Sequence, residues 1–80
     1  MNYYTRYVLS LPDLSYGERL YLIIAYDACD EEYRYYQEVV HKFFPKATIG
    51  RIETSLTEKG HISTIAYIRK RKFLRLNYKS

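Results

Sequence analysis

The sequence has one cysteine, three glycines and two prolines, and it has no tryptophan. A lone Cys29 forms no internal disulfide and no metal site by itself, which favours a reducing compartment inside the cell. Three glycines are too few for a glycine-rich phosphate loop of the usual form. Because tryptophan is missing, the eleven tyrosines must supply most of the large aromatic packing.

Long hydrophobic runs are also missing. The longest candidate, "LYLIIAY" at 20–26, is far below the roughly 20 residues that cross a bilayer. The opening "MNYYTRYVLS" does not follow the pattern of a secretion signal. We therefore expect a cytoplasmic, single-domain protein over residues 1–80. Sparse Asn and Gln together with many tyrosines would suit a thermophilic, archaeal or viral source.

Positive charge is scarce in the first half of the chain and abundant in the second. Residues 1–40 contain three Lys or Arg against seven Asp or Glu, whereas residues 41–80 contain ten against two. One half of the chain is therefore suited to a polyanion such as nucleic acid.

Three segments have helical periodicity. "SYGE" at 15–18 is a capping-box pattern that predicts a helix start, followed by an apolar stripe. A second helix is predicted over "DEEYRYYQEVVHKFF", with Asp30 as its cap and Pro45 after its end. A third, "KATIGRIETSLTEKG", ends in Lys59-Gly60, which is typical of a helix C-terminus. The first stripe is expected to comprise Tyr16, Leu20, Ile23, Ile24 and Ala28.

From His61 the apolar pattern alternates, which predicts two strands joined by a short turn. The turn carries four consecutive cations, Arg69 to Lys72, and lacks Asn-Gly, so its type stays open. The segment 1–13 fits either a short strand or a frayed helix. The expected fold class is α+β, with helices over 14–60 and a hairpin over 61–78.

The stretch "ATIGRIETSLTEKGHI", residues 47–62, resembles the recognition helix and following strand of winged helix-turn-helix regulators, including the MarR type. The resemblance rests on a Thr-apolar-x-Arg start, a spaced leucine and the final Gly-apolar pair. The preceding segment is loosely similar to the terminal winged-helix domain of archaeal replication initiators. Two departures are "FPKA", which offers no N-cap, and Glu53, where such families usually carry a semi-buried apolar residue.

The resemblance implies a transcriptional regulator that binds double-stranded DNA, with the third helix in the major groove and the basic hairpin as a wing on the phosphate backbone. Phosphate contacts from the Arg69 to Lys72 tip, Lys42, Lys46 and Arg51 would give a salt slope of about −5 to −6. The candidate DNA-binding residues are Lys42, Lys46, Thr48, Arg51, Thr54, Ser55, Arg69, Lys70, Arg71 and Lys72.

We expect no enzymatic activity, no cofactor and no metal, since neither His41 nor His61 has a second ligand at helical spacing. Winged-helix regulators commonly dimerise, and the tyrosine-rich start (Tyr3, Tyr4, Tyr7) is the candidate homodimer contact. Two alternatives stay open. One is a winged-helix adaptor or inhibitor, for example from a mobile element, whose basic face meets an acidic protein. The other is a DNA-binding factor for replication or plasmid maintenance.

Overall fold

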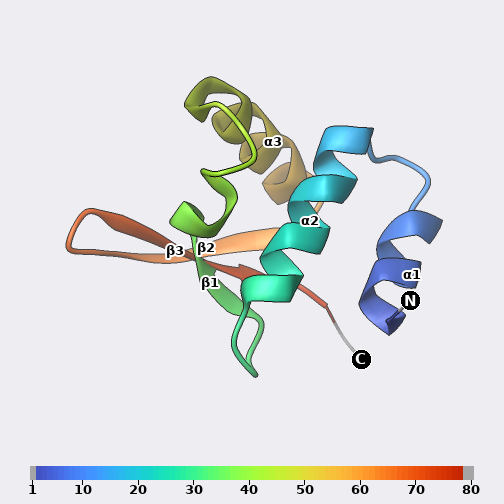
Figure 1. Ribbon diagram of the computed structural model, residues 1–80, viewed down its shortest axis with the longest axis horizontal. Helices are drawn as coiled ribbons and strands as arrows, with labels where there is room; N and C mark the ends of the chain where they lie inside the picture. Colours follow the sequence, from blue (N-terminus) through green and yellow to red (C-terminus); the bar gives the residue numbers. More distant parts are fainter. Residues whose placement is uncertain (1, 79–80) are drawn as a thin grey trace.

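The computed structural model describes residues 2–78 and has the expected α+β class, with three α-helices and one antiparallel sheet. Figure 1 shows α1 and the tip of the long hairpin at opposite ends of the molecule. No helix in the described range is long and apolar enough to cross a membrane. The elements in chain order are α1 (Tyr3–Ser10), α2 (Tyr16–Ala28), β1 (Arg34–Tyr36), the 3₁₀ helix η1 (Gln37–Val40), α3 (Lys46–Glu58), β2 (Ile62–Ile68) and β3 (Arg71–Leu76).

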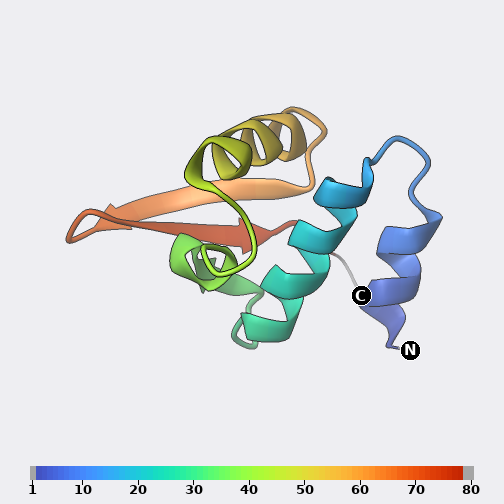
Figure 2. The same cartoon turned by 45° about the horizontal axis from the view of Figure 1, so that its top comes forward.

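The sheet has the strand order β1-β3-β2, with β3 in the centre. β2 and β3 form an antiparallel hairpin, as the alternating pattern predicts, and their register shifts at a bulge between Thr64 and Ala66. β1 adds to the other edge of β3, where Tyr35 lies opposite Leu74. Figure 2 shows the hairpin extending beyond α3, so its far end is not covered by a helix.

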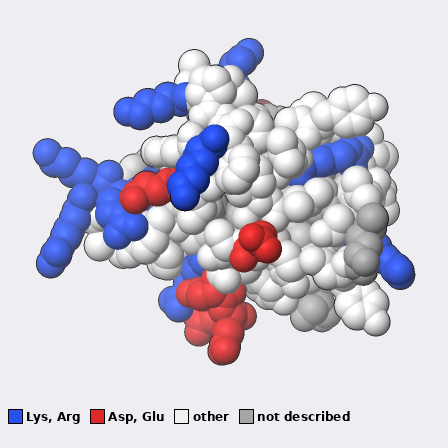
Figure 3. Space-filling model, in the orientation of Figure 1, with Lys and Arg blue, Asp and Glu red and all other residues white. Residues whose placement is uncertain are grey.

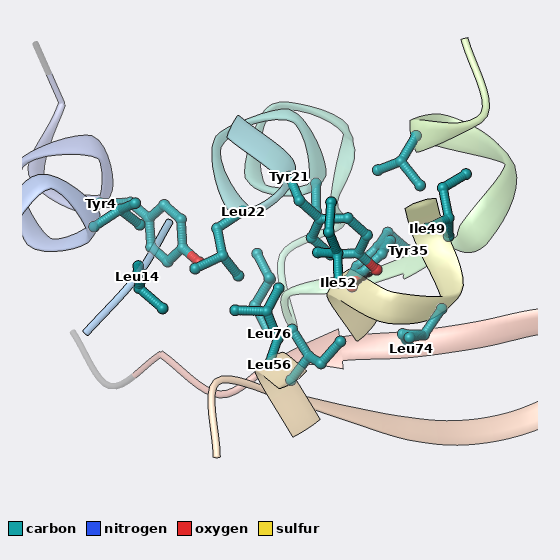
Figure 4. Packing of buried hydrophobic residues seen from close by; sticks show 14 residues of the cluster. Tyr4, Leu14, Tyr21, Leu22, Tyr35, Ile49, Ile52, Leu56, Leu74 and Leu76 are labelled. Carbon is teal, nitrogen blue, oxygen red and sulfur yellow. Dashed lines mark hydrogen bonds between the residues drawn. The ribbon is translucent and has the colours of Figure 1, made fainter. Parts of the chain in front are cut away.

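One hydrophobic core joins the helices to the inner face of the sheet (Figure 4). Inward residues of the strands alternate with outward ones, as a sheet covered on one side requires. The core residues are Tyr4, Val8, Leu14, Tyr21, Leu22, Ala25, Tyr35, Val40, Ile49, Ile52, Leu56, Ile62, Leu74 and Leu76. Each helix thus contributes side chains to the same interior.

The N-terminal segment is a helix, so the alternative of a short N-terminal strand is wrong. Asn2 caps α1 by accepting a hydrogen bond from the backbone N–H of Thr5 at 2.7 Å. Tyr4 stacks on Tyr26 with ring centroids 4.3 Å apart, and Tyr78 meets the Tyr4 ring edge-on at 4.8 Å. This aromatic cluster fixes α1 against α2 and the end of the sheet.

The helix predicted over residues 30–44 is wrong, because the chain forms β1 and η1 there instead. Asp30 does not begin a helix. Its side chain accepts hydrogen bonds from the backbone N–H groups of Glu32 and Arg34, both at 2.9 Å, and closes a turn. Tyr33 then adopts a positive φ of 65°, which ends any helical path. Pairing of β1 with β3 outweighs the weak helical periodicity of this segment.

The predicted start of α2 is confirmed, but the predicted buried stripe is wrong. Ser15 and Glu18 form both hydrogen bonds of the capping box. The buried face of α2 contains Glu18, Tyr21, Leu22 and Ala25. The stripe expected to face the core is only partly covered, and Tyr16 is 92% exposed. Several faces of α2 are apolar, so periodicity alone does not choose the buried one.

The third predicted helix is confirmed as α3, and Gly60 follows it with φ 82°, in the left-handed conformation that glycine favours. Glu18 clamps this helix to α2, because the Ser55 hydroxyl donates to the Glu18 carboxylate at 2.7 Å and Lys59 pairs with it at 3.1 Å. Burial opposes ionisation of Glu18. The hydrogen bonds from Ser15, Ser55 and Lys59 outweigh it and lower the pKa of the Glu18 carboxyl to about 2.

Replacing Glu18 by Gln tests this clamp. The pKa of the carboxyl is about 2 in the folded chain against an ordinary 4.5, so ionised Glu18 stabilises the fold above pH 4.5. That contribution is lost as pH falls from 4.5 towards 2. We expect Glu18→Gln to lower the free energy of unfolding at neutral pH by roughly 3 kcal/mol, and less at acid pH.

Urea titrations over this pH range measure the effect, with Glu58→Gln, an exposed carboxyl near the end of α3, as the matched control. A stability difference between Glu18→Gln and the parent that does not change with pH would contradict the clamp.

Candidate functional site

The hairpin turn consists of Arg69 and Lys70, and both residues have positive φ, 52° and 67°. Two consecutive residues of this kind join the strands with a twist that matches the hairpin, as in a type I′ turn. Asn-Gly suits such a turn best, whereas Arg and Lys have a Cβ atom that disfavours it. Both side chains are exposed at the end of the projecting hairpin. Arg69 and Lys70 therefore place two cations at the turn although their backbone conformation is less favourable than it would be for Asn-Gly.

Arg71 and Lys72, expected at the tip, belong instead to β3, where they lie opposite Ile68 and Tyr67. Arg71 forms an ion pair with Glu38 and lies 3.8 Å above the Tyr36 ring. The hydrogen bond from Arg71 lowers the pKa of Glu38. The four consecutive cations thus separate into two at the turn that make no ion pair with residues 2–78, and two that pair with acids of the same chain.

Lys72 points inward and pairs at 2.8 Å with Glu53, whose exposed fraction is 3%. Gln37 donates to the same carboxylate oxygen at 2.8 Å, and the Tyr21 hydroxyl donates to the other at 2.8 Å. Because Tyr21 uses its proton there, Tyr35 donates to Tyr21 at 2.7 Å. Burial raises the pKa of Tyr21 and of Tyr35, so both stay protonated donors. Glu53 is the residue that departs from the winged-helix pattern noted above. Both of its carboxylate oxygens accept hydrogen bonds.

This network fixes how α3 is rotated. With Glu53, Ile49, Ile52 and Leu56 buried, the opposite side of α3 faces outward. Arg51 and Thr54 are exposed on that side, and Thr48 is half-buried. Arg51 makes no ion pair within residues 2–78, so its guanidinium is available for an external partner.

Ser55 differs from the other candidates of α3. Its side chain is half-buried, and its hydroxyl is committed to Glu18. The Thr54 hydroxyl donates to the Gly50 carbonyl at 2.9 Å but lies on the exposed surface, where its oxygen still accepts hydrogen bonds. The structure therefore groups Arg51 and Thr54 as an outward pair, leaves Thr48 half-buried at the edge of that face, and gives Ser55 a positioning role.

Gly50 is a site residue that the sequence analysis did not select. It lies on the exposed side of α3, and a Cβ atom built on it would meet nothing within 4 Å. Glycine inside a helix costs about 1 kcal/mol relative to alanine, and no packing requires it here. Its effect is to leave the helix backbone accessible beside Thr54. A glycine within an otherwise regular helix, "TIGRIE", was the available signal.

Two lysines lie near the start of α3. Lys42 and Lys46 are exposed, and neither makes an ion pair in the described part of the chain. The N-cap is Pro45, so no side chain caps the first turn, and that turn has no acidic residue. Lys46 thus stands at the positive end of the helix dipole, where an anion is preferred.

Charge is distributed unevenly over the surface. In Figure 3 Lys and Arg project from the hairpin end and from the region of α3, and Asp and Glu gather at the loop between α2 and β1. The acids of that loop include Asp30 and Glu32, which pair with Arg34. The acids of this loop thus lie apart from the cations of the hairpin end, whereas Glu18 and Glu38 pair with Lys59 and Arg71 of the basic second half.

The three tyrosines expected at a homodimer contact have different environments. Tyr4 is buried in the core and Tyr7 is half-buried beside it, whereas Tyr3 is 83% exposed. Tyr4 is thus committed to holding α1. Of the three side chains, Tyr3 alone is largely open to a partner.

Within residues 2–78 no three His, Cys, Asp or Glu side chains gather closely enough to hold a metal ion. Comparisons of the chain with protein-family models, with curated proteins and with solved structures give no match.

Replacing the turn by Asn-Gly tests its backbone cost. We expect Arg69→Asn/Lys70→Gly to raise the free energy of unfolding by about 1 kcal/mol or more, since both new residues tolerate positive φ. For a chain of this size the melting temperature would rise by about 4–8 °C per kcal/mol. Thermal and urea unfolding measure the gain.

The matched control is Arg69→Gln/Lys70→Gln, which removes the same charges but keeps side chains that disfavour positive φ. It should not reproduce the gain in stability. An equal gain in both variants would mean that charge repulsion, rather than backbone conformation, destabilises the turn.

Proposed function

We propose that this chain is a winged helix-turn-helix domain that binds double-stranded DNA and regulates transcription. The observation that carries the proposal is the turn of Arg69 and Lys70, two cations kept where Asn-Gly would suit the backbone better. Local strain that the fold does not need is characteristic of sites that serve a ligand. A polyanion is the ligand that two exposed cations at a projecting tip would meet.

The order of elements supports the same proposal. α2, β1, α3 and the β2–β3 hairpin follow one another as the helices, strand and wing of a winged helix do, with η1 in place of the usual middle helix. In this assignment α1 is an addition that covers the core at the far end from the hairpin tip (Figure 1). The hairpin is the wing, and α3 is the recognition helix.

The exposed face of α3 is suited to the major groove. A helix fits that groove, and Arg51 is of the type that binds guanine O6 and N7 with two hydrogen bonds. Thr48 and Thr54 are short, and Gly50 has no side chain, so the helix can approach base edges closely. Sequence preference is thus assigned to Arg51 and its neighbours.

Backbone affinity is assigned to those exposed cations around α3 and at the wing tip that make no ion pair within residues 2–78. These are Lys42, Lys46 and Arg51 around α3, and Arg69 and Lys70 at the wing tip. Arg71 and Lys72 are already paired with Glu38 and Glu53. They would therefore neutralise no phosphate and release no counterion from DNA. Four or five phosphate contacts give a salt slope of about −4 to −5, smaller than the sequence alone implies.

Anisotropy binding to a random-sequence duplex over a salt series tests this assignment. Arg69→Gln/Lys70→Gln should reduce the slope by about 2, since each cation releases about one counterion. Arg6→Gln, on α1 at the opposite end, is the matched control and should leave the slope unchanged. No binding to duplex DNA at low salt would overturn the proposal in favour of an acidic protein partner.

Arg51→Ala separates sequence preference from bulk affinity. Specific sites are first enriched by the parent protein from a random pool. The free-energy difference between specific and nonspecific binding should fall by about 1–3 kcal/mol in the variant, because a bidentate base contact is lost. A loss of equal size on random DNA would place Arg51 on phosphate instead.

Gly50 gives a steric test of the recognition face. Both Gly50→Ala and Gly50→Leu should stabilise α3 by up to about 1 kcal/mol, since the site is open and helix propensity rises. Gly50→Leu alone adds bulk beside Thr54 on the exposed side of α3, so we expect it to weaken DNA binding at least about tenfold, and Gly50→Ala much less. Equal DNA affinities for the two variants would mean that this side of α3 does not meet the duplex.

A further inference from the structure

α2 carries a second apolar stripe that the chain does not fully cover. The stripe expected to be core lies beside the buried one, and Leu20 is 47% exposed on it. Ile23 and Ile24 are only partly buried, and Ala28 is exposed. A helix that is apolar on more than one face normally buries those faces, so the uncovered stripe indicates a contact surface.

This stripe forms one wall of a groove of about 510 Å³. Ile23, Ile24 and Ala28 of α2 line one side, and Val39 and Phe43 line the other. Figure 3 shows mainly uncharged atoms over α2 and beside it. Phe43 is 58% exposed, so an aromatic side chain projects next to an apolar hollow. A knob and a hole on one surface are the elements of a self-complementary contact.

Two charges of opposite sign flank the groove. Asp27 and Lys42 both line it, and neither makes an ion pair in the part of the chain that the structure describes. In a two-fold contact residue i meets residue j and residue j meets residue i. Asp27 of one copy would then meet Lys42 of the other, twice in each dimer.

We propose that this groove is the contact between two copies of the chain. Phe43 of each copy enters the hollow of the other, and the two Asp27–Lys42 pairs close the rim. The inference goes beyond DNA binding. In the dimer Lys42 serves the protein contact, which leaves Lys46, Arg51, Arg69 and Lys70 as the four cations of each copy that would meet phosphate. It also moves the homodimer contact away from the N-terminal tyrosines, of which Tyr4 is buried.

The free edge of β2 is a second surface to consider for self-association, and it is less suitable. Ile65, Tyr67 and Ile68 are exposed there. However, the strand contains a bulge between Thr64 and Ala66 and ends at the basic turn. Bulges and cations are the usual devices that prevent pairing of exposed edges. The groove has no such device, and its charges attract.

Sedimentation equilibrium of the full chain without DNA tests the proposal by charge reversal. Asp27→Lys or Lys42→Asp alone places like charges across the two-fold contact, so each should raise the dimer dissociation constant at least about tenfold. An equimolar mixture of the two variants restores opposite charges at both pairs. We expect dimers to return in the mixture, with a dissociation constant within about threefold of the parent.

The controls are matched in chemistry. Glu58→Lys makes the same charge change away from the groove, and Tyr3→Ser removes an exposed aromatic of α1, as Phe43→Ser does at the groove. Phe43→Ser should weaken the dimer at least about tenfold, and both controls should leave it unchanged. The proposal is overturned if the parent is monomeric at about 1 mM. It is also overturned if the groove variants dimerise like the parent, or if the mixture does not recover.

Discussion

The buried carboxylate of Glu53 is the interaction on which the arrangement of the molecule depends. It lies on α3 and receives hydrogen bonds from Tyr21 of α2, Gln37 of η1 and Lys72 of β3. A buried charge that lost one of these partners would strongly destabilise the fold. The network therefore fixes the positions of α2, η1, α3 and β3 relative to one another. That relation sets which face of α3 is exposed and aims it relative to the hairpin.

Local rules of folding are followed where they build the scaffold and broken where the proposed site lies. Asn2, Ser15 and Gly60 cap or end helices in the usual way. In contrast, α3 begins without a side-chain cap, contains Gly50 on an open face, and is followed by a hairpin whose turn is Arg69-Lys70. Natural sequences violate such rules mainly at functional sites. These departures therefore favour a binding role for α3 and the turn.

The features that could be predicted from the sequence are those set by neighbours in the chain. The capping box of Ser15, the end of α3 at Gly60 and the hairpin follow from short patterns. The prediction of a helix beginning at Asp30 was wrong because the same side chain can cap a helix or close a turn. The pairing of β1 with β3 determines which of the two forms. The partners of Glu53 are 16 to 32 residues away, so neither its burial nor the outward face of α3 follows from periodicity.

Because two of the four cations in the basic run pair with acids of the same chain, one copy of the chain has only two cations of that run left to contact an anion. Alternation along β3 sends Lys72 inward to Glu53 and Arg71 outward to Glu38, leaving Arg69 and Lys70 as the free cations of the run. In the proposed complex with DNA, four or five phosphate contacts would give only modest electrostatic affinity. A second copy docked through the groove at Phe43 would double those contacts and make the second binding event intramolecular. If the chain binds DNA as proposed, the pairing of Arg71 and Lys72 within the chain leaves the proposed dimer as the way to gain phosphate contacts.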